Sequence, residues 1–452
     1  MYFVTMAIER SAHRSGHAVF KLERMNLLLR RLGSPHGEVP TVHIAGTKGK
    51  GSTAAMVASM LTAGGYRTGL YTSPHLHSAV ERIRVGLEPI ERSKFAALVE
   101  LSWPVLEWVG VQGGYGPVTF FELITAMALL YFKQTSADFQ VIEVGLGGRL
   151  DATNVVSPEV SVITTISLDH VSILGDTLAL IANEKAGIIK PGVPVVVAPQ
   201  HPEALDVFLK VSADRRAPLV QVGKDVSWRK ARSDLDGQSF DVTGLRGSYD
   251  AWIPLLGDHQ LENAATAIAA VETLVGAGLA LPNESMMEGL RSVRWEGRLQ
   301  LISREGVRVV VDGAHNPYSV RRLVTAVRDY FQFRRIILIF GSLGGHSARG
   351  MIAELAGLSP LVLAVCSRHP RSASSDWVSE VVSELGLPLI FRSESVAEAT
   401  QRALELAGAG DLILATGSLF VATEVIEEIE GIEPELYHSI KRSSDKGASI
   451  VV

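Results

Sequence analysis

Short apolar runs recur along most of the chain and alternate with longer stretches rich in alanine and leucine. In the first part these runs have strand length, are bounded by Gly, Pro or Asp, and cover residues 42–45, 68–71, 139–144, 160–166 and 193–198. Segments between them, such as 52–63 and 122–132, have a helical composition. Continuous apolar strands separated by helices predict a mostly parallel sheet that is covered on both faces.

The alternation is interrupted once and then resumes. Residues 227–253 are polar and rich in turns, which predicts a small β excursion before a strongly periodic helix at 261–275. Further strands are predicted at 307–311, 335–340, 361–365, 388–391 and 411–415, with helices at 317–330 and 395–407 between them. The fold class is therefore α/β. We predict a mostly parallel, P-loop-type sheet domain over 1–296, a smaller Rossmann-like α/β domain over 297–437, and a flexible tail over 438–452.

Composition narrows the class of protein. Of the 452 residues, 47% are apolar and 20% are charged, which suits a globular chain with one core per domain. The net charge of -5 gives no basic face for nucleic acid. A single cysteine, Cys366, follows an apolar run, which predicts a buried thiol and a reducing, cytoplasmic location. We see no secretory signal and no run long enough to span a membrane, so we expect neither.

A glycine-rich segment, Gly46-Thr-Lys-Gly-Lys-Gly-Ser52, separates a predicted strand (41–45) from a predicted helix (53–61). Glycines let the backbone amides turn toward a polyphosphate, and the helix N-terminus adds its dipole. Lys50 would lie along the β- and γ-phosphates, and Ser52 could place its hydroxyl near magnesium. The spacing differs from the strict P-loop pattern, and a plain glycine-rich turn with solvated lysines is the alternative.

Polar residues lie at or just after the ends of three predicted strands of the same sheet. Glu143 ends one strand, Ser73 follows another, and His170 follows a third. Ligands gather at the carboxyl ends of parallel strands, so these residues predict a magnesium site. The alternatives are an exposed acid that begins a loop, an ordinary loop histidine and, for Lys185, a solvated helix lysine. Magnesium prefers oxygen ligands, so His170 would be an atypical one.

Taken in order, the segments of the chain resemble the Mur ligase superfamily, and within it the folylpolyglutamate and dihydrofolate synthases. Matching motifs are spread over most of the sequence: Leu22-Glu-Arg-Met25, the glycine-rich segment, Thr72-Ser-Pro-His-Leu76, Glu81-Arg-Ile83, Thr119-Phe-Phe-Glu122, 143–154, Leu168-Asp-His170, Lys185-Ala-Gly187, Gly257-Asp-His-Gln-Leu-Glu-Asn263, Gly297-Arg298, Asp312-Gly-Ala-His-Asn-Pro317 and Thr416-Gly-Ser418. The form Gly-Lys-Gly-Ser is similar to the folate branch, because the cell-wall branch usually has threonine directly after that lysine.

The resemblance implies a role for each matching position. The implied ligands are ATP, two magnesium ions, L-glutamate and a folate or dihydropteroate, bound by a monomer. ATP would be held by Gly49, Lys50, Gly51, Ser52, Asn263, Arg298 and Asp312. Magnesium would be held by Ser73, Glu143 and His170, beside a carbamylated Lys185. The pterin substrate is expected near Thr119, Phe120, Ala152, Thr153 and Asn154. Lys50, Lys185 and His315 are the implied catalytic residues, and His315 and Ser418 are candidates for the incoming glutamate or the γ-phosphate.

The chain also departs from the family pattern. The family often has asparagine at the position of Lys48 and proline at that of Glu296, and 340–347 lacks an Asp-Lys-Asp run. The chemistry that fits is activation of a carboxylate as an acyl phosphate, followed by attack of the glutamate amine.

Three alternatives remain. The first is a cell-wall Mur ligase acting on a UDP-muropeptide, although only about 40 residues precede the phosphate loop. The others are a non-catalytic nucleotide switch and a simple kinase.

Overall fold

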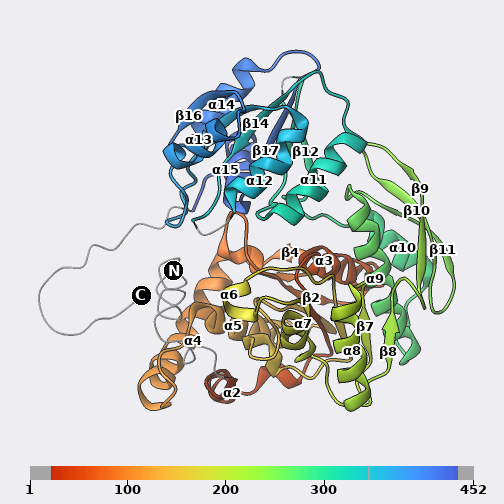
Figure 1. The fold of residues 1–452 in the computed structure, drawn as a ribbon. Coiled ribbons are helices and arrows are strands. Elements are labelled where there is room, and N and C mark those ends of the chain that lie inside the picture. Colours follow the sequence, from red (N-terminus) through yellow and green to blue (C-terminus); the bar gives the residue numbers. More distant parts are fainter. Residues whose placement is uncertain (1–21, 305, 345–346, 436–452) are drawn as a thin grey trace, which may run out of the picture.

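The computed structural model describes residues 22–304, 306–344 and 347–435 (Figure 1). These residues form three sheets, with eight, three and six strands. In Figure 1 the first sheet and its helices form the lower unit, the six-stranded sheet forms the upper unit, and the three-stranded sheet lies at their side. The predicted tail at 438–452 lies outside the described residues.

The first sheet has the strand order β4-β3-β2-β5-β1-β6-β7-β8. Its strands are β1 (Thr41–Ala45), β2 (Thr68–Tyr71), β3 (Ile83–Val85), β4 (Glu88–Pro89), β5 (Phe139–Glu143), β6 (Val160–Ile163), β7 (Val195–Val197) and β8 (Leu219–Gln221). The six strands from β2 to β8 in this order pair in parallel, and the β3–β4 hairpin adds an antiparallel edge. Strands β2, β5, β1 and β6 are neighbours, so their carboxyl ends open onto one crevice.

Helices cover both faces of this sheet, as its continuous apolar strands predict. They are α2 (Leu22–Arg31), α3 (Lys50–Ala63), α4 (Arg92–Gln112), α5 (Phe120–Gln134), α6 (Val171–Leu174), α7 (Leu178–Ala186), α8 (Pro202–Asp214), α9 (Asp258–Gly276) and α10 (Asn283–Ser292), with short 3-10 turns η1 (Pro35–Gly37), η2 (Ala79–Arg82) and η3 (Ala152–Val155). Helices α3, α9 and α10 lie on one face. The other face is covered by α2, α4 and α5 near β2 and β5, and by α7 and α8 near β6 and β7.

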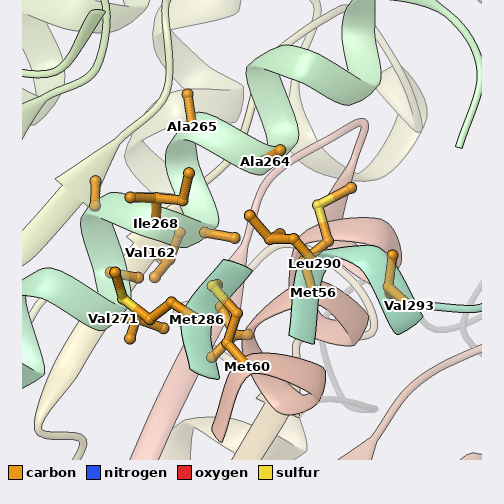
Figure 2. Close-up of a cluster of buried hydrophobic side chains, with 14 of the residues drawn as sticks. Met56, Met60, Val162, Ala264, Ala265, Ile268, Val271, Met286, Leu290 and Val293 are labelled. Carbon is orange, nitrogen blue, oxygen red and sulfur yellow. The ribbon is translucent and has the colours of Figure 1, made fainter. Parts of the chain in front are cut away.

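The core under α3 is built where three helices meet (Figure 2). Side chains of α3, α9 and α10 pack there together with Val162 of β6: Met56, Met60, Ala264, Ala265, Ile268, Val271, Met286 and Leu290. Met56, Met60, Ile268 and Leu290 have no exposed surface. Burying aliphatic side chains of this size contributes about 1.5–3 kcal/mol each, so the phosphate-loop helix has a rigid base.

The three-stranded sheet contains β9 (Ser227–Ser233), β10 (Gln238–Thr243) and β11 (Ser248–Ile253), all antiparallel. This confirms the predicted β excursion. It contacts the second unit through Tyr330, whose hydroxyl donates to Gln238 and accepts from Lys230.

The six-stranded sheet has the order β12-β13-β17-β14-β15-β16, and only the β12–β13 pair is antiparallel. Its strands are β12 (Gln300–Arg304), β13 (Val307–Val311), β14 (Ile336–Phe340), β15 (Leu361–Val365), β16 (Leu389–Ser393) and β17 (Leu412–Thr416). One face is covered by α11 (Pro317–Tyr330), α12 (Ala348–Leu355), η4 (Ala356–Leu358) and α13 (Ser375–Glu384), and the other by α14 (Val396–Leu406) and α15 (Leu419–Glu430).

The α/β class and both alternating patterns are confirmed, and the differences are local. The strand predicted at 160–166 ends at Ile163, and helix α3 begins at Lys50 instead of residue 53, because glycine and serine are tolerated in a first helical turn. Cys366 is only partly buried, since it lies just beyond β15. Division of the chain at residue 296 stays a prediction. Within the described part of the chain, no helix has the length and apolar character needed to cross a membrane.

Candidate functional site

The predicted phosphate loop joins β1 to α3 and faces the crevice at the carboxyl edge of the first sheet. The amides of Thr47 and Lys48 donate to the carbonyl of Thr165 at 3.0 and 3.1 Å. Those two amides are therefore committed to the segment that follows β6. The amides that open a helix have no intrahelical acceptor, and the dipole makes this end electropositive. The amides from Gly49 to Ser52 are thus the ones that can donate hydrogen bonds to phosphate oxygens.

Two glycines of the loop allow close approach of other elements. Gly49 has φ 88°, and a Cβ there would lie 2.2 Å from Oδ1 of Asn263. A Cβ at Gly51 would lie 2.7 Å from the ring of Trp295. A side chain at Gly49 would displace the Asn263 carboxamide, and one at Gly51 would displace the Trp295 ring. The structure therefore brings Asn263, predicted to contact the nucleotide, directly beside the phosphate loop.

Lys50, Glu143 and Ser73 meet at the ends of β2 and β5 and the start of α3. Nζ of Lys50 lies 3.9 Å from Oε1 of Glu143, and Oε2 of Glu143 accepts the Ser73 amide at 3.0 Å. Burial raises the pKa of the Glu143 carboxyl, and the charge of Lys50 opposes that shift. Glu143 lies at the sheet edge where the sequence predicts an acid. It is only 4% exposed, so the alternative of an exposed acid that begins a loop is wrong.

Lys185 projects from α7 into the same region. Its side chain is buried, and Nζ donates to the carbonyl of Gly46 at 2.8 Å. Burial, followed by repulsion from Lys50, lowers the pKa of Lys185 to about 7. A solvated helix lysine would have neither property, so that alternative is wrong. A buried amine that is neutral near physiological pH is a candidate for chemistry or modification.

His170 has a different environment. It adopts a left-handed conformation with φ 50°, and its side chain is 54% exposed. Nε2 of His170 lies 4.0 Å from Oδ1 of Asp169. In the described ranges, no three His, Cys, Asp or Glu side chains are grouped so that they could hold a metal ion. Of the three predicted magnesium ligands, the fold brings Glu143 and Ser73 into contact. His170 lies apart from them, at the exposed rim of the crevice.

A second ionic cluster connects the loop to the six-stranded sheet. Nζ of Lys48 donates to Oδ2 of Asp169 at 2.8 Å and lies 3.3 Å from Nε2 of His315. Nδ1 of His315 lies 2.9 Å from the carbonyl oxygen of Gly313. The adjacent cations and hydrogen bonds hold the pKa of Asp169 well below its usual range, against the effect of burial. Asp169 received no role from the sequence, although a carboxylate directly before His170 was an available signal.

Arg298 and Asp312 lie at the junction between the units. Asp312 follows β13, and its two carboxylate oxygens accept the amides of Leu299 and Ala314, each at 2.8 Å. Burial raises the pKa of Asp312, and the neighbouring Arg298 opposes that shift. Arg298 donates to the carbonyl of Gly297 at 3.0 Å. The structure thus brings both predicted nucleotide contacts to the same junction.

Thr119 and Phe120, predicted near the pterin, open helix α5. Thr119 caps the helix by accepting the Glu122 amide, and Glu122 returns a bond to the Thr119 amide at 2.8 Å. Phe120 is buried, with the Arg82 guanidinium 5.3 Å from its ring centre. An aromatic ring beside a guanidinium can hold a flat heterocycle, but the hydroxyl of Thr119 is already used.

Ala152, Thr153 and Asn154 form the η3 turn, and all three are buried. Thr153 donates to Asp151 at 2.5 Å and also contacts Nε2 of His43 at 2.9 Å. Asn154 donates to a backbone carbonyl at 3.0 Å. The Thr153 hydroxyl and the Asn154 amide nitrogen are thus engaged inside the protein, whereas Oδ1 of Asn154 is buried without a hydrogen-bond partner among the described residues. Contact of this turn with a substrate stays a prediction.

Ser418 caps helix α15, where its hydroxyl accepts the Phe420 amide at 3.1 Å. It lies at the carboxyl end of β17, on the edge that also carries Asp312. The structure therefore places Ser418 at the expected edge but gives its side chain a structural partner.

Known protein families match two parts of the chain. Residues 92–271 match the Mur ligase middle domain, and residues 297–419 match the Mur ligase glutamate ligase domain. Among characterised relatives, the chain is 37% identical over 413 residues to the dihydrofolate synthase/folylpolyglutamate synthase of Bacillus subtilis, covering 90% of this chain and 95% of that protein.

Solved structures agree. The folylpolyglutamate synthase of Mycobacterium tuberculosis, complexed with ADP, superposes with a TM-score of 0.86 at 33% identity, covering 96% of this chain and 99% of that one. E. coli FolC, in complex with DHPP and ADP, gives a TM-score of 0.81 at 30% identity, covering 95% and 98%. The resemblance found in the motifs thus extends over the whole fold.

Proposed function

The chain belongs to the folylpolyglutamate synthase and dihydrofolate synthase family of Mur ligases, and we propose that it joins L-glutamate to a folate or dihydropteroate carboxylate at the expense of ATP. The products are the glutamylated pterin, ADP and phosphate. Homologues bound to ADP and to DHPP support this substrate set.

One observation carries the proposal. Lys50 opens a helix whose first amides face the crevice, and its ammonium lies 3.9 Å from the buried Glu143 carboxylate. A phosphate bound by those amides would lie beside a fixed cation, and the neighbouring carboxylate would be positioned to hold a metal ion against the same phosphate. This is the arrangement that phosphoryl transfer requires, because catalysis there depends on positioning and charge stabilisation.

The reaction then proceeds in two transfers. An oxygen of the substrate carboxylate attacks the γ-phosphorus, the bond to the ADP oxygen breaks, and an acyl phosphate forms. Lys50 and the α3 amides stabilise the charge that develops on the phosphoryl oxygens. The glutamate amine next attacks the acyl carbon, the amide bond forms, and phosphate leaves as the amine loses its proton. Arg298 and Asp312, at the junction, would hold the nucleotide while the closed crevice excludes water.

The oxygen-bearing side chains at this sheet edge match part of a magnesium ligand set. Glu143 offers a buried carboxylate at the end of β5, next to Ser73, and carboxylate oxygens are preferred magnesium ligands. Glu143 and Ser73, with His170 at the rim, would hold the metal. When bound, magnesium offsets phosphate charge and orients the phosphoryl group for transfer.

Lys185 fits the proposed carbamylation. Its amine is buried and its pKa is lowered to about 7, so a neutral nucleophile is available near physiological pH. The ammonium form first loses one proton, and the neutral amine nitrogen then adds to carbon dioxide and releases a second proton. The cation is thereby converted into a carbamate anion near Lys48 and Lys50. The carbamate nitrogen keeps an N–H, so it can still donate to the Gly46 carbonyl.

The test is glutamate-dependent phosphate release, with dihydropteroate and tetrahydrofolate compared side by side under ATP and magnesium. We expect release with at least one of the two acceptors and none without glutamate. Release only with a UDP-muropeptide would mean a cell-wall ligase, release without any amino acid would mean a kinase or ATPase, and ATP binding without release would mean a nucleotide switch.

A further inference from the structure

The side chain of Gln238 is buried where the three-stranded sheet meets the second unit. It has no exposed surface, and its amide nitrogen donates to the carbonyls of Leu255 and Gly257 at 2.6 and 3.0 Å. Its carbonyl oxygen accepts from the hydroxyl of Tyr330 at 2.5 Å. Backbone carbonyls can only accept, so the amide nitrogen must face them and the Tyr330 hydroxyl must be a donor. Gln238 therefore joins the second unit to the turn at 255–257.

Lys230 of β9 adds a second link around the same hydroxyl. Its ammonium donates to Oη of Tyr330 at 3.0 Å and to Oδ1 of Asp258, the first residue of α9, at 2.9 Å. The ammonium also lies 4.8 Å from the centre of the Tyr330 ring. An ammonium, a hydroxyl and a carboxamide in series polarise one another, which strengthens each bond. Tyr330 is thus tied both to the turn before α9 and to the first residue of that helix.

These links hold the start of α9, which carries a residue of the nucleotide site. The Gly257 carbonyl accepts the Gln260 amide at 2.8 Å, in the first turn of the helix. The Gln260 side chain in turn accepts from the Asn263 carboxamide at 2.9 Å. Asn263 lies so close to the phosphate loop that a Cβ at Gly49 would be 2.2 Å from its Oδ1. A shift of the first turn of α9 would therefore move Asn263 relative to the phosphate loop.

Helix α11 connects this contact to the crevice. Tyr330 is its last residue, and the helix begins directly after His315 and Asn316. Its 14 residues, at a rise of 1.5 Å per residue, give a length of about 21 Å. One end of α11 thus lies at the crevice, while the other end rests on the three-stranded sheet. A change in how the second unit sits on the first would displace the Tyr330 hydroxyl from Gln238.

We propose that Tyr330 and Gln238 are positioning residues for the nucleotide, which hold Asn263 against the phosphate loop when the second unit is seated on the three-stranded sheet. The proposal rests on the proposed ligase function, because it concerns the nucleotide of that reaction. Both residues act through the turn at 255–257 and the first turn of α9. The three-stranded sheet thereby connects the position of the second unit to the affinity for nucleotide.

The rival explanation is a brace that stabilises the fold without affecting the site. A brace changes the free energy of unfolding but leaves the affinity of the folded protein for nucleotide unchanged. Binding of ADP separates the two explanations, because it requires neither the acceptor substrate nor glutamate. The Kd for ADP is measured on the full chain by isothermal titration calorimetry, and stability is measured by urea unfolding.

Tyr330→Phe removes one hydroxyl and keeps the ring beside Lys230. We expect the Kd for ADP to rise about 3- to 10-fold, the range for loss of one hydrogen bond. Tyr249→Phe is the matched control, since it removes a tyrosine bond of the same sheet, to Glu272 at 2.6 Å, at the far end of α9. The control should lower stability and leave the Kd unchanged. An unchanged Kd in Tyr330→Phe, or an equal rise in both variants, would overturn the proposal.

Gln238→Met breaks the same path at its centre and should weaken ADP binding at least as much. The double variant with Tyr330→Phe should bind ADP no more weakly than Gln238→Met alone, because contacts in one path are not additive. Additive losses would overturn the shared path. Should Gln238→Met fail to fold, Tyr330→Phe and its control decide the question. A wild-type chain that binds ADP but releases no phosphate with glutamate and an acceptor would refute the ligase function, independently of the result at Tyr330.

Discussion

The carboxyl edges of the two large sheets carry polar residues with different tasks. The first edge holds charges with few compensating partners: Lys50 is 3.9 Å from Glu143, and Lys185 has a carbonyl as its hydrogen-bond acceptor. Polar residues at the loops of the second unit mostly cap helices, namely Asn316, Ser347, Ser374, Ser395 and Ser418.

Burying a charge is unfavourable unless it is paired, whereas a helix cap stabilises the protein by about 1 kcal/mol. The first edge is therefore held in an electrostatically costly arrangement, which is the usual mark of a catalytic centre. The second edge is locally satisfied, and it contributes to the site mainly through Asp312 and His315. Chemistry and positioning are thus divided between the two sheets.

Replacing Lys50 of the first edge should have the largest effect on activity. Lys50→Ala should reduce ATP turnover by about 10²- to 10³-fold or more, because the developing phosphoryl charge loses its fixed cation. Phosphate release with saturating acceptor and glutamate measures this, and Lys94→Ala is the control, since Lys94 lies on the exposed face of α4. Activity near the wild-type level would contradict the ligase proposal.

Lys185→Ala should lower activity by about 10²-fold, because the carbamate is expected to act as a carboxylate-like ligand of the bound magnesium. A small carboxylate such as acetate should restore part of the activity by occupying the vacated volume. Intact-protein mass spectrometry in bicarbonate buffer should show one carbamate on the wild-type chain and none on the variant. A wild-type chain without the modification, yet fully active, would refute the role.

Activity should also depend on pH through Lys185. Its folded-state pKa of about 7 lies below the ordinary lysine value of 10.5, so the amine is mostly charged below pH 7 and mostly neutral above it. Only the neutral amine reacts with carbon dioxide, so carbamylation and activity should fall as the pH drops below 7. Added bicarbonate should shift this loss toward lower pH. A pH profile that is indifferent to bicarbonate would be inconsistent with this assignment.

The smallest effect is expected on the second sheet. Ser395 caps α14 by accepting the Glu398 amide at 3.3 Å, far from the crevice groups. Ser395→Ala should reduce the free energy of unfolding by about 1 kcal/mol and leave kcat unchanged. Urea unfolding and steady-state assays provide the two measurements. A drop in kcat without a drop in stability would mean that the two edges are less separate than we infer.

Much of the division between a catalytic first edge and a helix-capping second edge can be predicted from the sequence. The apolar run 139–144 carries Glu143 near its carboxyl end, and parallel sheets collect ligands at that end, so the position of Glu143 in the sequence is sufficient to predict an acid at the site. The start of α3 was missed by three residues because glycine has a poor helix propensity in the interior but is tolerated in the first turn. Cys366 was placed in the core because it follows an apolar run, although the strand had already ended.

The contacts of single side chains were less accessible. A lysine on a short helix is usually solvated, and only the packing of α7 against the phosphate loop buries Lys185. Asp169 and His315 are far apart in the chain, and nothing local in either segment indicates that both face Lys48.

By itself, the sequence determined the alternation of strands and helices, the glycine loop, and the motifs that identify the family. Hydrophobic periodicity and backbone preferences are properties of neighbouring residues, so they can be read without knowing the fold. Only the tertiary structure decided that Lys185 is buried, that Asn263 touches the glycine loop, and that Lys48 is shared between the two units. Burial and charge interactions depend on distances across the folded chain, and those distances are set by how the sheets and helices pack.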